Sequence, residues 1–140
     1  MAEALATAGM PEPKRKGFEM SSAGTAAFDG MRAATNAVKV LAELGIDISN
    51  HRARLLTKEM VDEADLVVVM AEGHREEILD LAPGSAGKVI LLGELDNKRE
   101  TPDIADPIGG DEEAYRKTRD EIAALVPRLI DYFNEIFRVG

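Results

Sequence analysis

Residues 66–92 read LVVVMAEGHREEILDLAPGSAGKVILL, and this stretch decides the fold. It contains two continuous apolar runs, 66–70 and 89–92, with a helical segment, 74–81, between them. Continuous apolar runs, as opposed to alternating ones, are typical of strands that helices cover on both faces. The order strand, helix, strand therefore predicts a βαβ unit with two central parallel strands.

The helix inside this unit is expected to point Ile78 and Leu81 inward. The segment Ala82-Pro83-Gly84 ends it, because proline cannot continue a helix. On the N-terminal side of the unit, a short helix is expected to follow Thr57, whose hydroxyl can serve as its N-cap.

Two more helices and one more strand are expected earlier in the chain. The first ten residues have a helical composition, and 31–44 carries apolar residues at three- and four-residue steps. Gly45 supplies the left-handed position that ends the second of these helices. Between the two helices, 17–23 alternates roughly and predicts a short strand before a turn over 22–25.

The final helix is expected to begin after Gly109-Gly110, with Asp111 as its N-cap. Pro127 lacks an amide hydrogen and lies inside the apolar stripe of this helix, so either a kink near 123–127 or two abutting helices is expected. The stripe consists of Tyr115, Ile122, Leu125, Val126, Leu129, Ile130, Phe133 and Ile136.

These elements predict one α/β domain over residues 1–140, built as a three-layer sandwich with a mostly parallel sheet. Functional sites of such folds lie beyond the C-terminal ends of the strands. The loop 103–110, DIADPIGG, opens onto the final helix and carries Asp106, the strongest candidate for a catalytic group.

Composition excludes several kinds of partner. Seventeen basic and 26 acidic residues give a formal net charge of -9, which repels nucleic acid and anionic membranes. The longest apolar run, 66–71, is far below the roughly 20 residues of a membrane span, and a cytoplasmic protein is expected.

The chain contains no cysteine, and this excludes a disulfide, a thiolate metal site and a thiol nucleophile of its own. His51 and His74 stand far apart in the sequence without partners at ligand spacing. Neither a metal nor another cofactor is therefore expected.

Five motifs occur in register along the chain, and together they closely resemble the low-molecular-weight protein tyrosine phosphatases over about residues 1–133. They are Met1-Ala2-Glu3-Ala4-Leu5, Ser22-Ala23-Gly24-Thr25, the segment 51–56 (HRARLL), Ala64-Asp65-Leu66 with Met70, and Asp106-Pro107. Within this family, 106–121 is most similar to the bacterial branch that includes the protein-arginine phosphatases. The resemblance implies a flavodoxin-like fold.

In the family, a buried strand and a phosphate loop of the form C-x5-R-[ST]-P precede the segment that residues 1–5 resemble. The resemblance therefore implies an N-terminally truncated domain whose first strand is missing. The nucleophilic cysteine and the arginine that grips the phosphate have no counterpart in this sequence.

The resemblance also assigns roles to four residues. Asp106 is implied as the general acid and later the base, Pro107 as the restraint on its loop, Ser22 as a hydrogen-bond partner of the phosphate loop, and Ile108 as part of the mouth of the substrate cleft. Plainer roles stay open: a turn carboxylate for Asp106, a turn cap for Ser22 and simple packing for Ile108.

The function implied by the resemblance is hydrolysis of phosphotyrosine or phosphoarginine in proteins, or of a small phosphate ester, through a cysteinyl-phosphate intermediate. Without a cysteine this chain is expected to be inactive as it stands. The alternative is a non-catalytic binding or regulatory module on the same scaffold. A missing strand would also expose strand edges, so a homo-oligomer is possible.

Overall fold

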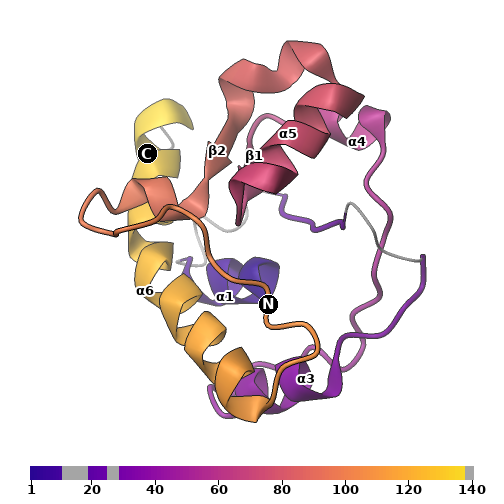
Figure 1. Ribbon diagram of the computed structural model, residues 1–140, viewed down its shortest axis with the longest axis vertical. Helices are drawn as coiled ribbons and strands as arrows, with labels where there is room; N and C mark the ends of the chain where they lie inside the picture. Colours follow the sequence, from indigo (N-terminus) through magenta and orange to yellow (C-terminus); the bar gives the residue numbers. More distant parts are fainter. Residues whose placement is uncertain (11–18, 25–28, 138–140) are drawn as a thin grey trace.

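The computed structural model describes residues 1–10, 19–24 and 29–137 (Figure 1). In chain order the elements are α1 (Ala2–Gly9), α3 (Thr35–Ala42), α4 (Lys58–Glu63), β1 (Val67–Val69), α5 (Glu72–Leu81), the 3-10 helix η1 (Pro83–Lys88), β2 (Val89–Leu91), the 3-10 helix η2 (Leu92–Leu95) and α6 (Glu112–Phe137).

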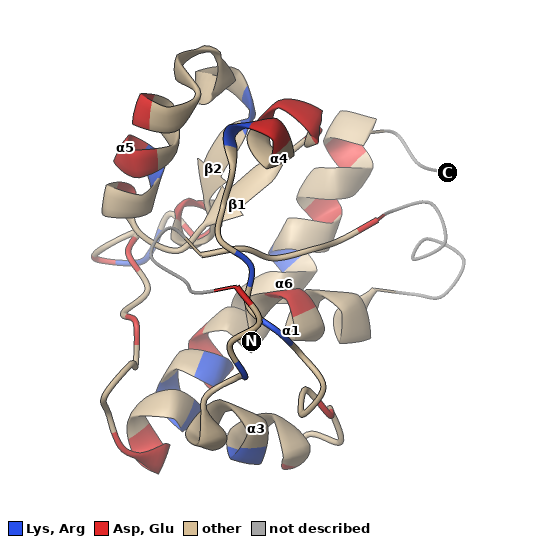
Figure 2. Ribbon diagram, turned by 90° about the vertical axis from the view of Figure 1, so that its right-hand side faces the viewer, with Lys and Arg blue, Asp and Glu red and all other residues tan. Residues whose placement is uncertain are grey.

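The predicted βαβ unit is confirmed. β1 and β2 pair in parallel, with Val68 opposite Ile90, and α5 connects them. Alternate residues of the strands face two different apolar clusters. Val69 packs with Ile78 of α5, while Val68 and Ile90 pack against the cluster that α1 and α6 share. Figure 2 shows α5 and α6 on opposite sides of the strands, which gives the three layers.

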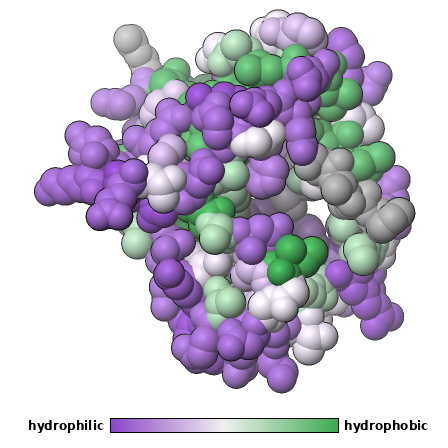
Figure 3. Space-filling view, in the orientation of Figure 1, coloured by the Kyte–Doolittle hydropathy of each residue, from purple (hydrophilic) through white to green (hydrophobic). Residues whose placement is uncertain are grey.

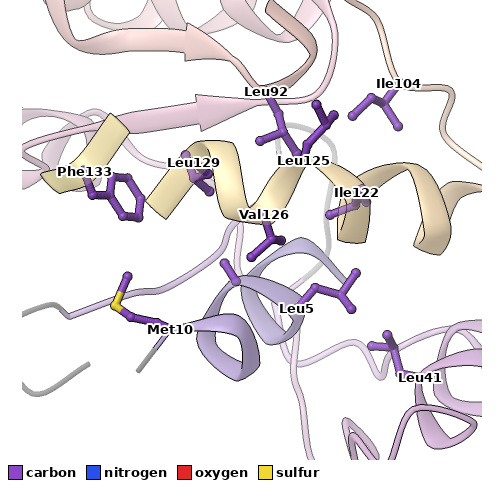
Figure 4. Close-up of a cluster of buried hydrophobic side chains, with 11 residues drawn as sticks. Leu5, Met10, Leu41, Leu92, Ile104, Ile122, Leu125, Val126, Leu129 and Phe133 are labelled. Atoms are coloured by element: carbon purple, nitrogen blue, oxygen red, sulfur yellow. The ribbon is translucent and has the colours of Figure 1, made fainter. Parts of the chain in front are cut away.

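The largest cluster lies where α1 packs on α6. Leu5 and Val126 meet between these helices, and Leu92 and Leu125 continue the cluster toward the strands (Figure 4). The helices approach closely at Gly9, where a Cβ atom would lie 2.6 Å from Cγ1 of Val126. A small residue at this position therefore sets the distance between α1 and α6.

Charged residues join α3 to α6 on the outside of this cluster (Figure 2). Arg119 is 7% exposed and donates from Nη1 to the Val40 carbonyl at 2.8 Å and to the Glu43 carboxylate at 2.6 Å. Arg116 donates to the other oxygen of the same carboxylate at 2.7 Å. Hydrogen bonds from Arg116 and then Arg119 lower the pKa of Glu43 to about 2.

The predicted helix ends agree with the structure at several points. The Thr57 hydroxyl accepts from the Met60 amide at 3.2 Å, and the Asp111 carboxylate accepts from the Ala114 amide at 2.9 Å. Gly45 has φ 76°. Of the two possibilities for the final helix, a break into two helices is wrong, because α6 runs without interruption through Pro127.

Other expectations about local structure are wrong. Residues 17 and 18 lie outside the described residues, but 19–23 form no strand; only Gly24 pairs, in an isolated parallel bridge with Leu55. A strand requires a neighbour along its whole length, and these residues have none in the described part of the chain. The second helix begins at Thr35 and not at residue 31, because Arg32 is extended and bridges to Arg52.

Two apolar residues expected to be buried are exposed. Leu81, the last residue of α5, is 39% exposed, because the inward position is taken by Ala82, which is 3% exposed. Ile136 is 44% exposed in the last turn of α6. Figure 3 shows hydrophilic side chains over most of one face, with apolar side chains gathered in patches between them. Among the described residues no helix is long and apolar enough to span a membrane.

Candidate active-site loop

The loop that carries Asp106 begins beside the C-terminal end of β1. The Ile104 amide donates to the Met70 carbonyl at 2.8 Å, and the Ile104 side chain is only 3% exposed. One residue earlier, the Asp103 carboxylate accepts from the Glu72 amide at the start of α5, at 3.0 Å. The loop therefore starts at the edge of the sheet where α/β folds place their sites.

Asp106 stands on the exposed turn that follows these anchors. Its Oδ1 atom accepts from the Ile108 amide at 3.0 Å, a hydrogen bond across Pro107 that makes an Asx turn. Within the described segments Oδ2 accepts no hydrogen bond from the protein. One carboxylate oxygen thus orients the side chain, and the other faces no hydrogen-bond donor of the described residues.

The two glycines after this turn are required by its geometry. Gly109 has φ 78°, a left-handed conformation that most residues avoid. The Gly110 amide donates to the Pro107 carbonyl at 2.8 Å, and a Cβ atom on Gly110 would lie 2.8 Å from the same oxygen. The backbone then passes directly into α6, with Asp111 as its N-cap.

Pro107 and Ile108 follow Asp106 on the surface. Pro107 is half-buried, whereas Ile108 is 78% exposed. A packing role for Ile108 is therefore wrong, because its side chain contacts solvent more than protein. An exposed apolar side chain beside a candidate acid can contact the apolar part of a ligand.

Ser22 lies apart from this loop, at a cavity of about 230 Å³. Its carbonyl accepts from Nε and Nη2 of Arg54, both at 3.3 Å. The cavity is lined by Ser22 together with Met1, Glu3, Ala4, Met31, Arg32, Ala33, Ala34, Ala37, Ile48, His51 and Ala53. Asp106, Pro107 and Ile108 are absent from this lining, so the described residues do not bring the four candidates into one pocket.

The histidines are placed separately. Nδ1 of His51 lies 3.9 Å from the Glu3 carboxylate at the edge of this cavity, whereas His74 lies in the first turn of α5. Among the residues that the structure describes, no group of three or more His, Cys, Asp or Glu side chains could hold a metal ion.

Two buried polar residues of α6 were missed from the sequence. Thr118 is 6% exposed and its hydroxyl donates to the Ala105 carbonyl at 3.2 Å, next to Asp106. Arg119 holds α3, as described above. A signal was present, because both residues fall on the helical repeat of the apolar stripe, between Tyr115 and Ile122.

Comparison with known proteins connects this chain and its α/β fold to phosphatases. A family model described as low molecular weight phosphotyrosine protein phosphatase matches residues 1–138. A protein-arginine-phosphatase of Geobacillus stearothermophilus is 37% identical over 127 residues, which cover 91% of this chain and 84% of the relative. EpsP of Ralstonia nicotianae, a probable low molecular weight protein-tyrosine-phosphatase, is 40% identical over 133 residues, with coverage of 92% and 86%.

A solved structure gives the same result. The YwlE arginine phosphatase from Geobacillus stearothermophilus matches with a TM-score of 0.82 at 37% identity, covering 96% of this chain and 83% of that one. The chain belongs to the low molecular weight phosphotyrosine protein phosphatase family. The expected family, its bacterial arginine phosphatase relatives and the α/β fold with a parallel sheet are confirmed.

Proposed function

We propose that Asp106 is the general acid, and later the general base, of a phosphatase site that acts on phosphorylated side chains of proteins. A general acid must reach the leaving atom and must be held in a productive direction. The observation that carries the proposal is the Asx turn of Asp106, in which Ile108 N–H holds one carboxylate oxygen and the other is free. The turn follows Ile104, which is buried at the end of β1.

The nucleophile is the second part of the proposal. A cysteinyl-phosphate intermediate requires a thiolate that attacks phosphorus while the leaving group takes a proton from the acid. This 140-residue chain contains no cysteine, so it cannot form that intermediate. We therefore expect the chain by itself to release no phosphate from an aryl phosphate or from phosphoarginine.

The test has two arms. The 140-residue chain is assayed with an aryl phosphate and with phosphoarginine, and no turnover is expected. A second protein, extended upstream of Met1 by a strand and a C-x5-R-[ST]-P loop, is expected to hydrolyse at least one of these substrates. In that protein Asp106→Asn should lower kcat by about a hundredfold or more.

Asp111→Asn is the matched control. It removes the exposed carboxylate of the residue that follows the loop, but asparagine caps a helix as well as aspartate does. Its kcat should stay near that of the parent. If Asp106→Asn behaves like Asp111→Asn, Asp106 is not the acid. If the unextended chain shows turnover that Asp106→Asn abolishes, the claim about the nucleophile is wrong.

A binding or regulatory module is the second candidate. The scaffold matches a phosphatase with a TM-score of 0.82, although the sequence has no cysteine. A module of this kind should bind a phosphotyrosine or phosphoarginine peptide without releasing phosphate. Calorimetry with phosphorylated and unphosphorylated forms of one peptide tests this, and equal affinities would exclude it.

Association of two copies is a further part of the proposal. Among the described strands β1 pairs with β2 alone, so one edge of β1 has no strand beside it. An open edge can pair with another chain. Light scattering should then give a dimer whose fraction rises with concentration, and a monomer at all concentrations would refute the idea.

A further inference from the structure

The peptide that leads into Asp106 is held from α6. Ala105 immediately precedes Asp106, and its carbonyl accepts from the Thr118 hydroxyl at 3.2 Å. Threonine hydroxyls inside helices usually bond to a carbonyl of their own helix. The Thr118 hydroxyl instead reaches out of α6 to a residue 13 positions earlier.

The hydrogen bond from Thr118 to Ala105 is important because the Thr118 side chain is buried. Thr118 is 6% exposed on a helix face that is otherwise largely apolar. A buried hydroxyl is destabilising when it is left without a partner, and the Ala105 carbonyl is the partner of the Thr118 hydroxyl. The contact therefore favours one position of the loop relative to α6.

Three consecutive residues before Asp106 are attached to three different elements. Asp103 is bonded to the start of α5, Ile104 to the end of β1 and Ala105 to α6. The Ala105 carbonyl and the Asp106 amide belong to one planar peptide group. Fixing the direction of that carbonyl therefore fixes the plane from which the Asp106 side chain departs.

We propose that Thr118 is a positioning residue that orients the Asp106 carboxylate through the Ala105–Asp106 peptide. The inference rests on the proposed role of Asp106 for its catalytic meaning. The claim that Thr118 holds the loop can be tested separately, because it does not require the protein to hydrolyse a substrate.

The primary test uses the 140-residue chain and amide hydrogen exchange. Thr118→Val keeps the shape of the side chain and removes the donor, while Thr118→Ser keeps the donor. Exchange of the Ile108 amide, which is bonded to Asp106, should be about five- to tenfold faster in Thr118→Val and should return to the parental rate in Thr118→Ser. Exchange of the Ile104 amide should not change, because the Met70 carbonyl, directly after β1, accepts its hydrogen bond.

Thr7→Val is the matched control. The Thr7 hydroxyl also donates to a backbone carbonyl, that of Glu3, at 2.8 Å, but within α1. This variant should leave exchange at Ile108 unchanged. If Thr118→Val speeds exchange at Ile104 and Ile108 alike, or leaves Ile108 at the parental rate, Thr118 is not a positioning residue.

The effect of Thr118 on catalysis is measured in the protein extended upstream of Met1. There Thr118→Val should lower kcat with little change in KM, and Thr118→Ser should restore kcat. If Asp106→Asn lowers kcat but Thr118→Val does not, the positioning role of Thr118 is wrong and the acid role of Asp106 stands. If Asp106→Asn is itself unimpaired, the acid role fails, and with it the catalytic meaning of Thr118. The exchange result still decides whether Thr118 holds the loop.

Discussion

Gly93→Ala should destabilise the protein strongly and displace the start of the loop 103–110. Gly93 lies in η2 and is buried against the backbone of Pro102. A Cβ atom on Gly93 would overlap the Pro102 carbonyl oxygen and lie 2.7 Å from the carbonyl carbon and 3.0 Å from Cα. These are backbone atoms, so no side-chain rotation relieves the overlap.

The size of the stability loss depends on which atoms must move to relieve the overlap. Overpacking of a well-packed site is destabilising by about 1–3 kcal/mol, and a clash with backbone lies at the upper end of that range. We expect a decrease of about 3 kcal/mol in the free energy of unfolding for Gly93→Ala. Because Asp103 follows Pro102, the displacement should also weaken its hydrogen bond to the Glu72 amide.

Urea denaturation measures the loss of stability. Amide exchange at Glu72 measures the weakening of its hydrogen bond to Asp103. Gly87→Ala is the control, because Gly87 also lies in a 3-10 helix, η1, and a Cβ atom there would meet nothing within 4 Å. Gly87→Ala should change stability by less than about 0.5 kcal/mol. The reasoning is refuted if Gly93→Ala is as stable as Gly87→Ala.

Three further substitutions test the packing, the capping and the charges. Gly9→Ala should be destabilising by about 1–2 kcal/mol in urea denaturation, because its Cβ meets Val126, whereas Gly73→Ala, with open space in α5, should be neutral or stabilising. Thr57→Ala should lower stability by about 1 kcal/mol through loss of the α4 cap, and Thr57→Ser should lose less; equal losses would exclude the cap as the cause. The pKa of Glu43 is lowered from 4.5 to about 2, so its ion pairs stabilise the fold above pH 4.5 and this contribution is lost as the pH falls toward 2. Glu43→Gln should therefore reduce the urea midpoint at pH 7 and flatten its decline between pH 4.5 and 2. The control is Glu76→Gln, which removes an exposed carboxylate that has no ion pair among the described residues.

The central fold could be predicted because two covered strands require a particular kind of sequence. Val68 and Val69 face opposite layers, and only an uninterrupted apolar run satisfies both. Of the strand expected over 17–23, the described residues 19–23 form none, because strand formation depends on a neighbour that local sequence does not reveal. The helix ends at Thr57 and Asp111 were predictable, since a cap is a contact within a few residues.

The candidate site was predictable only in part, because some of its hydrogen bonds join residues that are far apart in the sequence. Asp106 and its turn are a local pattern, because the hydrogen bond spans two residues. Thr118 and Arg119 make their bonds over 13 and 79 positions, and neither partner can be read from the neighbouring sequence. Their position on the apolar stripe was the available signal, because a polar residue on a buried face requires a partner.

The anchors of the loop 103–110 explain how Asp106, the proposed acid, can be kept in place in a chain that contains no cysteine. Asp103, Ile104 and Ala105 are held by α5, β1 and α6, and Asp106 by the next turn. None of these hydrogen bonds involves a thiol or a phosphate loop. The orientation of Asp106 should therefore be the same before and after a C-x5-R loop is supplied, because the two halves of the proposed site rest on different contacts. Chemical shifts of 103–110 that move widely when the loop is supplied would show instead that the acid is oriented by the nucleophile's loop.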